Sequence, residues 1–214
     1  MTSPLIILDF DGTIADTQGL IVQTMQQTIA ELGLPERTKQ ECAAMIGLPL
    51  KETFTKLIPM SDEMGDQCRD VYSRHFNENN VPGAVPLFPH VKETIEELHG
   101  QGAVLTIATS RHRESLVAFL QEMDMEKYIR FIVCGNDIER PKPAPDMVLH
   151  ILDIFNTSPN DAIVVGDAVY DILMGRSAGV KTVGVSYGNG LQEELIQAGA
   201  DHIIHDFSTL KELV

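Results

Sequence analysis

The sequence predicts an α/β fold: a Rossmann-like, doubly wound parallel sheet as the core, with an inserted all-helical cap domain. Short apolar runs recur along the chain, and several are continuous rather than alternating, as in strands buried on both faces. In the second half of the chain, amphipathic stretches separate these runs, and such an alternation of strands and helices indicates a parallel sheet. The expected strands are residues 5–8, 103–108, 131–134, 162–166, 182–185 and 202–204.

The first half of the chain interrupts this alternation, which predicts the insertion. Helical patterns follow one another between the first strand and about residue 81, and no strand is expected there. Gly33 and Gly47 are typical of helix ends, and Ser61 is typical of a helix N-cap. Pro, Gly and Asn gather in residues 77–89, which indicates a linker back to the core. The expected domains are a core of residues 1–15 and 82–214 and a cap of residues 16–81.

Composition limits the classes of partner. The 214 residues carry a formal net charge of -15, which argues against nucleic acid and anionic membrane surfaces as partners. Three cysteines without a CxxC pair indicate reduced thiols, and the start of the chain lacks a secretory pattern, so a cytoplasmic protein is expected. A small phosphorylated substrate remains compatible with this charge if a metal or local positive charge accompanies it. The sequence leaves open whether the protein is a monomer or a homodimer.

Two acids follow the first predicted strand directly. Asp9 and Asp11 are two residues apart, so in extended chain both side chains face the same side while Phe10 turns into the core. Carboxylates this close raise each other's pKa unless a cation compensates them. The pair therefore indicates a metal site or a division of labour between the two acids.

Other polar residues follow the remaining strands, and in an open parallel sheet ligands bind beyond the carboxyl ends of the strands. These residues are Thr109 and Ser110, Lys142, and Asp167 with Asp171. Clustered carboxylates favour Mg²⁺, and no Cys/His spacing suggests zinc. A carboxylate can attack phosphorus, and the lysine, the two hydroxyls and backbone N–H groups can hold the phosphoryl oxygens. The expected N–H donors are those of Gly12, Thr13 and a helix start at Ser110.

Four motifs closely resemble those of the haloacid dehalogenase (HAD) superfamily, in order and spacing, over nearly the whole chain. They are "DFDGT" (9–13), Thr109 in "IATS", Lys142 in "RPKPAPD" and "GDAVYD" (166–171). The stretch "GNGLQEELIQAGADHII" (188–204) is similar to the tail of phosphoglycolate-phosphatase-like members. The helical insert resembles the mobile cap of that subgroup.

This resemblance implies a role for each acid. Asp9 is the expected nucleophile, and Asp11 is the expected general acid and then base. Magnesium is expected on the Asp9 side chain, the Asp11 backbone carbonyl and Asp167, with Asp171 as a further ligand or a support behind the ligands. Lys142 and Thr109 are expected to bind the transferring phosphoryl group.

The resemblance also ranks related activities. Members that dehalogenate lack an acid at the position of Asp11, so dehalogenation is disfavoured. Phosphosugar mutases of the β-phosphoglucomutase type use a His and a cap Arg where this chain has Ile21 and Leu50, although Lys51 is adjacent. Hydrolysis of a small phosphomonoester is therefore expected, with phosphoglycolate, a sugar phosphate and pyrophosphate as candidate substrates. The cap loop of residues 46–54 is expected to contact the substrate.

Two interpretations without catalysis remain. A catalytically silent phosphate-binding scaffold would usually have lost one of the key acids or the lysine, and all are present. A receiver-type domain would lack the helical insert. The sequence does not decide whether Arg111 or Lys51 contacts the substrate: Arg111 is read equally as a surface charge, and Ser110 as a simple helix N-cap.

Overall fold

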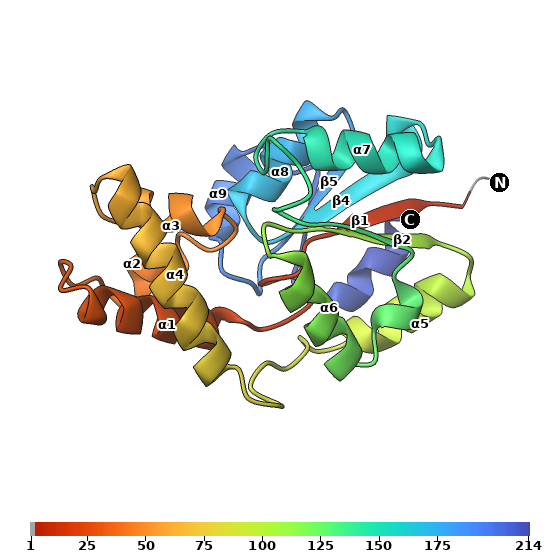
Figure 1. The fold of residues 1–214 in the computed structure, drawn as a ribbon. Helices are drawn as coiled ribbons and strands as arrows, with labels where there is room; N and C mark the ends of the chain where they lie inside the picture. Colours follow the sequence, from red (N-terminus) through yellow and green to blue (C-terminus); the bar gives the residue numbers. More distant parts are fainter. Residues whose placement is uncertain (1–2) are drawn as a thin grey trace.

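A computed structural model, described here for residues 3–214, contains the predicted parallel sheet (Figure 1). Its six strands lie in the order β3-β2-β1-β4-β5-β6, and each neighbouring pair is parallel. The strands are β1 (Leu5–Leu8), β2 (Val104–Ala108), β3 (Phe131–Val133), β4 (Ala162–Gly166), β5 (Lys181–Val185) and β6 (His202–Ile204). The predicted α/β class is confirmed, and the first strand lies in the middle of the sheet.

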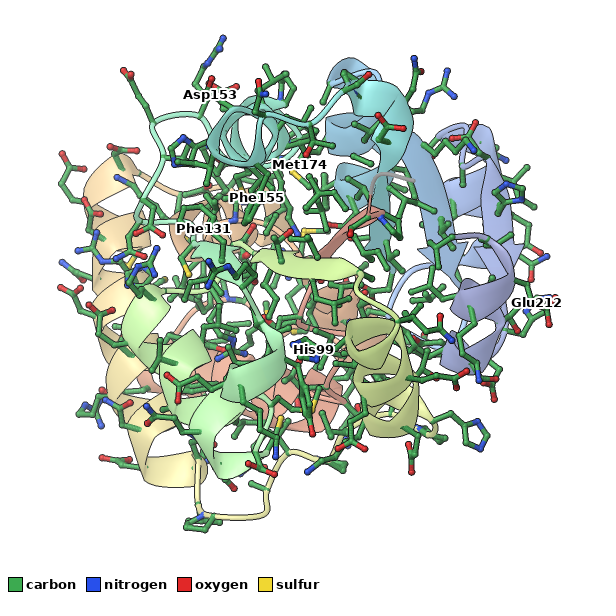
Figure 2. All side chains as sticks on the ribbon, turned by 90° about the vertical axis from the view of Figure 1, so that its right-hand side faces the viewer. His99, Phe131, Asp153, Phe155, Met174 and Glu212 are labelled. Carbon is green, nitrogen blue, oxygen red and sulfur yellow. The ribbon has the colours of Figure 1, made fainter. Side chains whose placement is uncertain are left out.

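Helices cover both faces of the sheet, with α5 and α6 on one side and α7 and α8 on the other (Figure 1). The core helices are α5 (Val91–Gly100), α6 (Arg113–Glu122), α7 (Asp146–Phe155), α8 (Val169–Ser177) and α9 (Gln192–Gln197). Three short 3₁₀ helices are η1 (Glu126–Tyr128), η2 (Pro159–Asp161) and η3 (Phe207–Glu212). Figure 2 shows Phe131 of β3 beneath α7, where its ring centroid lies 6.2 Å from that of Phe155.

The continuous apolar run of β1 serves both faces. Ile6 and Leu8 belong to the cluster that includes residues of α5, α6 and the cap, whereas Leu5 and Ile7 pack with residues of α7 and α8. All four side chains are at most 1% exposed. This explains why the run lacks polar alternation, since a central parallel strand has no solvent face.

Four helices stand between β1 and α5 and form the separate group at the left of Figure 1. They are α1 (Gln18–Glu31), α2 (Lys39–Ala43), α3 (Leu50–Leu57) and α4 (Asp62–Asn79). Ser61 caps α4 as predicted, because its hydroxyl accepts a hydrogen bond from the Met64 N–H. Gly33 follows the end of α1 with a φ of +63°. Gly47 was wrongly predicted to end a helix: α2 already ends at Ala43, and Gly47 lies in the turn before α3.

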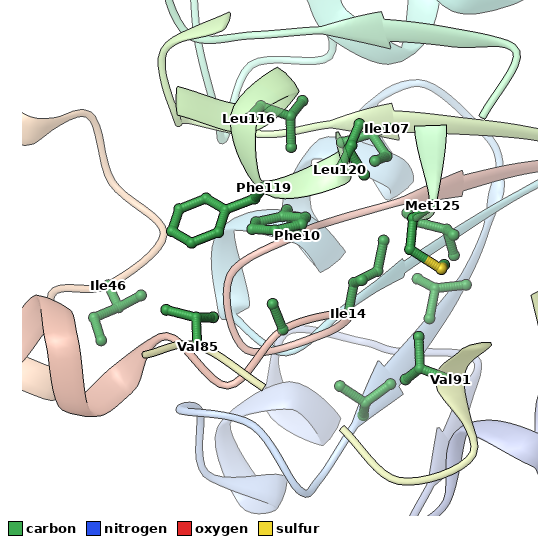
Figure 3. Close-up of a cluster of buried hydrophobic side chains, with 14 of the residues drawn as sticks. Phe10, Ile14, Ile46, Val85, Val91, Ile107, Leu116, Phe119, Leu120 and Met125 are labelled. Carbon is green, nitrogen blue, oxygen red and sulfur yellow. The ribbon is translucent and has the colours of Figure 1, made fainter. Parts of the chain in front are cut away.

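The two connections between these helices and the core run side by side. The Asp16 N–H donates to the Pro86 carbonyl at 2.9 Å, and the Phe88 N–H donates to the Ile14 carbonyl at 3.1 Å. Apolar packing continues past this junction, and Figure 3 shows Phe10 beside Phe119.

Within residues 3–214, no helix combines the length and the apolar character needed to cross a bilayer.

Candidate active site

Both predicted acids reach one cavity at the carboxyl edge of the sheet. Asp9 directly follows β1, and its N–H donates to the Val165 carbonyl of β4 at 2.8 Å, which continues the sheet pairing by one residue. Asp9 and Asp11 line a cavity of about 440 Å³ between the core and the cap helices. Phe10 between them is fully buried. The alternation expected from the sequence therefore holds.

Three buried carboxylates gather at this edge. Asp9, Asp167 and Asp171 each offer an oxygen, and these atoms all lie within 4.8 Å of one another. The buried Lys142 ammonium donates to Asp9 Oδ1 at 2.5 Å and to Asp171 Oδ1 at 2.6 Å. The structure thus brings together four residues that the sequence separates by up to 162 positions, Asp9 to Asp171.

The electrostatics of this cluster indicate that a cation is needed. Burial raises the pKa of Asp9 well above its usual range, with Lys142 opposing and the charges of Asp171 and Asp167 adding to the rise. Burial and the Asp171 charge raise the pKa of Asp167 to about 7, against hydrogen bonds from Asn189. One ammonium faces three carboxylates. A divalent cation with a preference for hard oxygen ligands, such as Mg²⁺, fits this donor set.

The oxygens are not equally available to such an ion. Asp171 Oδ2 accepts the Ala168 N–H at 3.0 Å while Oδ1 accepts Lys142, so both of its oxygens have protein donors. In contrast, the hydrogen bonds within residues 3–214 leave Asp9 Oδ2 and Asp167 Oδ1 without a protein donor. Gly166 makes the Asp171 contact possible, since a Cβ there would lie 2.4 Å from Asp171 Oδ2.

One polar partner of the site was missed by the sequence reading. Asn189 donates to Asp167 Oδ2 twice, from its backbone N–H at 2.6 Å and from its side-chain amide at 2.9 Å. The flanking glycines let the loop approach closely, because a Cβ on Gly188 would lie 2.4 Å from Asp167 Cβ. A Gly-Asn-Gly triplet separated from the end of β5 by two residues was the available signal.

The turn after Asp11 corrects one expectation. The Gly12 N–H donates to the Ala15 carbonyl at 3.0 Å and the Thr13 N–H donates to the Phe10 carbonyl at 3.4 Å, so in this structure neither is free for a phosphoryl group. Gly12 is still required here: its φ is +89°, and a Cβ would lie 2.1 Å from Asp167 Oδ2. The buried Thr13 Oγ1 finds no hydrogen-bond partner within residues 3–214.

The two hydroxyls after β2 differ in use. Thr109 lines the cavity and its Oγ1 accepts the Arg111 N–H at 3.2 Å, which leaves its own hydroxyl proton available. Ser110 instead donates to the Gly47 carbonyl of the cap at 2.7 Å. It is neither a helix start nor an N-cap, because α6 begins at Arg113. Ser110 therefore joins the core to the cap and is a poor candidate for holding phosphate.

Arg111 is not a surface charge. Its guanidinium pairs with the Asp11 carboxylate through Nε, at 3.1 Å, and through Nη2. Nη1 donates to the Ser115 hydroxyl at 2.8 Å. Burial alone would lower the pKa of Arg111, but Asp11 raises it further above its already high range, so the group is cationic. Three aromatic rings surround the guanidinium. The ring centroids of Phe10, Phe76 and Phe119 lie 5.7, 5.2 and 4.9 Å from Arg111 Cζ.

The cap supplies the opposite wall of the cavity. Its apolar lining residues are Ile21, Met25, Ile46, Leu48, Leu50, Tyr72 and Phe76. The loop of residues 46–54 thus contributes to this wall, as its sequence position suggested. Lys51 does not: its ammonium pairs with Asp62 at 2.8 Å and Asp66 at 3.2 Å on α4. The idea that Lys51 replaces the cap arginine of mutases is therefore wrong for this structure.

Comparisons with known proteins agree with this site. The family model for haloacid dehalogenase-like hydrolases matches residues 6–185. The probable phosphatase IndB of Dickeya dadantii is 32% identical, over 96% of this chain and 90% of that protein. The pyrophosphatase PpaX of Anoxybacillus flavithermus is 29% identical, over 98% and 95%, and the phosphoglycolate phosphatase of Photorhabdus laumondii is 28% identical, over 96% and 89%.

A solved structure supports the same conclusion. A haloacid dehalogenase-like hydrolase from Bacteroides fragilis superposes with a TM-score of 0.92 at 26% identity, over 98% of this chain and all of that one. The family match includes Asp9, Thr109, Lys142 and Asp167. The chain therefore belongs to the haloacid dehalogenase-like hydrolase family, as its four motifs predicted, and is a hydrolase of the phosphatase type.

Proposed function

We propose that this protein is a Mg²⁺-dependent phosphomonoesterase that acts on a small phosphorylated metabolite through an aspartyl-phosphate intermediate. The arrangement of Asp9 carries the proposal. Its carboxylate is buried, one oxygen is fixed by Lys142, and the residue lines the cavity together with Asp11. A fixed carboxylate beside a second acid is what nucleophilic attack followed by proton transfer requires.

Asp9, Asp167 and the Asp11 backbone carbonyl would hold the metal. Asp171 would act behind these ligands, because its oxygens already receive Lys142 and the Ala168 N–H. Asn189 fixes the orientation of Asp167. When bound, Mg²⁺ supplies positive charge that offsets the charges of the nucleophile and the phosphoryl oxygens.

Residues of this chain account for both chemical steps, the transfer of the phosphoryl group to Asp9 and its hydrolysis. Asp9 attacks phosphorus, an Asp9–phosphorus bond forms, the ester bond breaks, and the leaving oxygen takes a proton from Asp11. Water then attacks the phosphorus and gives a proton to Asp11, and the breaking Asp9–phosphorus bond releases inorganic phosphate. Lys142 and the free Thr109 hydroxyl proton are suited to the phosphoryl oxygens.

The substrate class is small because the cavity is small and the cap covers it. Relatives named phosphoglycolate phosphatase and pyrophosphatase support two candidates, and a sugar phosphate is the third. A mutase is disfavoured since Ile21 and Leu50 line the cavity where mutases place charged groups. All named groups come from one chain, so a monomer or a homodimer would have complete sites. A cytoplasmic location would keep the three buried thiols reduced.

The test is phosphate release with Mg²⁺ from phosphoglycolate, pyrophosphate, a hexose phosphate and a nucleoside monophosphate. Asp9→Asn should lower release from every substrate by at least about 10³-fold, because the nucleophile is lost. Asp16→Asn is the matched control, since Asp16 is exposed and outside the cavity. Circular dichroism should show both variants folded. Equal release by wild type and Asp9→Asn would refute the nucleophile, and no release by wild type would favour a silent scaffold.

A further inference from the structure

Arg111 is a buried cation whose hydrogen bonds are incomplete. Its side chain is 7% exposed. A guanidinium has five N–H donors, and the bonds to Asp11 and Ser115 use three of them. Two N–H groups are thus left without a protein acceptor among residues 3–214. Burying unpaired donors of a charged group is costly, which points to a ligand that completes the set.

The surroundings of Arg111 indicate the chemical class of that ligand. Arg111 is the only Lys or Arg side chain among the described residues that line the cavity. The cap wall opposite combines its apolar residues with the uncharged polar residues Thr53, Ser73, Asn77 and Asn80. A guanidinium in such a wall would bind an anion. The planar N–H donors of Arg111 suit a carboxylate or a phosphoryl group.

The position of Arg111 says which part of the substrate it would meet. Asp11, the proposed general acid, must face the leaving oxygen, and Arg111 bonds directly to Asp11. A group one or two bonds beyond the leaving oxygen would therefore lie near Arg111. The phosphoryl group itself would lie at Asp9, whose Oδ1 accepts a hydrogen bond from Lys142.

We propose that Arg111 binds a second anionic group, carried by the leaving group of the substrate, and thereby selects small phosphate compounds with an anionic leaving group over those whose leaving group is uncharged. This inference rests on the proposed phosphatase activity. The shared chemistry is a negative charge close to the scissile bond, and its two sources are the carboxylate of a phosphorylated hydroxy acid and the second phosphoryl group of pyrophosphate.

The packing of Arg111 shows how this selection could be tied to the cap. Phe76 comes from α4 of the cap, whereas Phe10 and Phe119 come from the core, and all three rings face the same guanidinium. Ser110 beside it donates to the cap loop at Gly47. The Arg111 side chain is thus held in place by both domains, and its free donors stay fixed without the substrate.

The experiment compares matched substrates. Phosphoglycolate and pyrophosphate carry the second anion, whereas 2-hydroxyethyl phosphate is an analogue of phosphoglycolate with an uncharged leaving group and is called the neutral substrate below. For Arg111→Met, kcat/KM should fall at least about tenfold further for the preferred anionic substrate than for the neutral one. Arg111→Lys keeps the charge and should restore part of this difference. Because phosphoglycolate and 2-hydroxyethyl phosphate both leave as alkoxides that need a proton from Asp11, the ratio of their rates removes any effect of Arg111 on Asp11.

Arg113→Met is the matched control, since Arg113 is only two residues further along the chain but pairs with Asp137 outside the cavity. It should leave the anionic-to-neutral ratio unchanged. Equal losses of Arg111→Met on all three substrates would overturn the inference, as would a wild type that prefers the neutral substrate. If wild type releases no phosphate from any of them, the proposed function itself has failed. The substrate for which Arg111→Met lowers kcat/KM more, phosphoglycolate or pyrophosphate, identifies the source of the anion.

Discussion

The two walls of the cavity are built differently. On the sheet side, Asp9, Lys142, Asp167 and Asp171 are buried. Lys142 donates to Asp9 and Asp171, and Asp171 and Asp167 also accept from the Ala168 N–H and from Asn189, all at 2.5 to 3.0 Å. On the cap side, the wall is mainly aliphatic and aromatic, and the charged Lys51 is turned away to α4. Arg111 lies where the two walls meet.

This difference indicates where chemistry and selection reside. Substituting one charged residue of a buried network leaves its partner unpaired, so few substitutions are expected to be tolerated on the sheet side. Aliphatic side chains can exchange at modest cost, so the cap side can be altered to admit other leaving groups. The predictions below test this contrast, beginning with the largest effect.

Removing the Lys142 ammonium should destabilise the buried charge network on the sheet side. Lys142→Met leaves Asp9 and Asp171 buried without their ammonium partner, so the free energy of unfolding should fall by about 3–5 kcal/mol in Mg²⁺-free buffer. Phosphate release should be lost as well. Urea denaturation followed by circular dichroism measures the stability change.

Lys127→Met is the control for this substitution. Lys127 also pairs with an aspartate, Asp124 at 2.7 Å, but both side chains are exposed. It should leave unfolding unchanged. A Lys142→Met protein as stable as this control would show that the buried network does not depend on its lysine.

The pH dependence of stability should reveal the excess of carboxylates. Because the pKa of Asp167 is raised from 3.8 to about 7, the metal-free folded protein binds more protons than the unfolded chain between these values. The free energy of unfolding should therefore fall as pH rises through this window, and the raised pKa of Asp9 acts in the same direction. Since Mg²⁺ binds the ionised carboxylates, it should raise Tm more near pH 8 than near about pH 5.

Asp167→Asn separates this effect from other titrations. The variant should show a flatter stability profile across the same window and a smaller response to Mg²⁺. Asp70→Asn, with Asp70 exposed on α4, should behave like wild type. A steep profile that persists in Asp167→Asn would mean that Asp9 or groups outside this cluster cause it.

A change on the cap side should act on selection only. Ile21→Ala enlarges the cavity wall, and the relative kcat/KM for two substrates of different leaving-group size should shift about tenfold. The Mg²⁺ dependence should not change, because Ile21 is not part of the acidic cluster. Steady-state kinetics with Leu149→Ala, an exposed residue of α7, as the control would measure this. A shift in metal dependence instead of substrate preference would contradict the division between the two walls.

Much of the molecule could be predicted from local patterns. Continuous apolar runs identified the strands, because a parallel strand buried on both faces has no reason to alternate. The spacing of Asp9 and Asp11 placed both side chains in one cavity, because strand geometry has a period of two. Motif order identified the family, and Ser61 identified the start of α4 since an N-cap depends on a few neighbouring residues.

Only the tertiary structure decided the partners of these residues. The N–H groups of Gly12 and Thr13 are used by their own turn, Ser110 donates to the cap, and Arg111 pairs with Asp11. Asn189 reaches Asp167 from a loop 22 residues away. The physical reason is that a hydrogen bond depends on the placement of both of its groups, which is set by how the chain turns and where its segments meet, whereas burial and period follow from the local pattern of residues. The acids and Lys142 were therefore predictable from the sequence, whereas the pairing of Arg111 with Asp11 and of Asn189 with Asp167 was not.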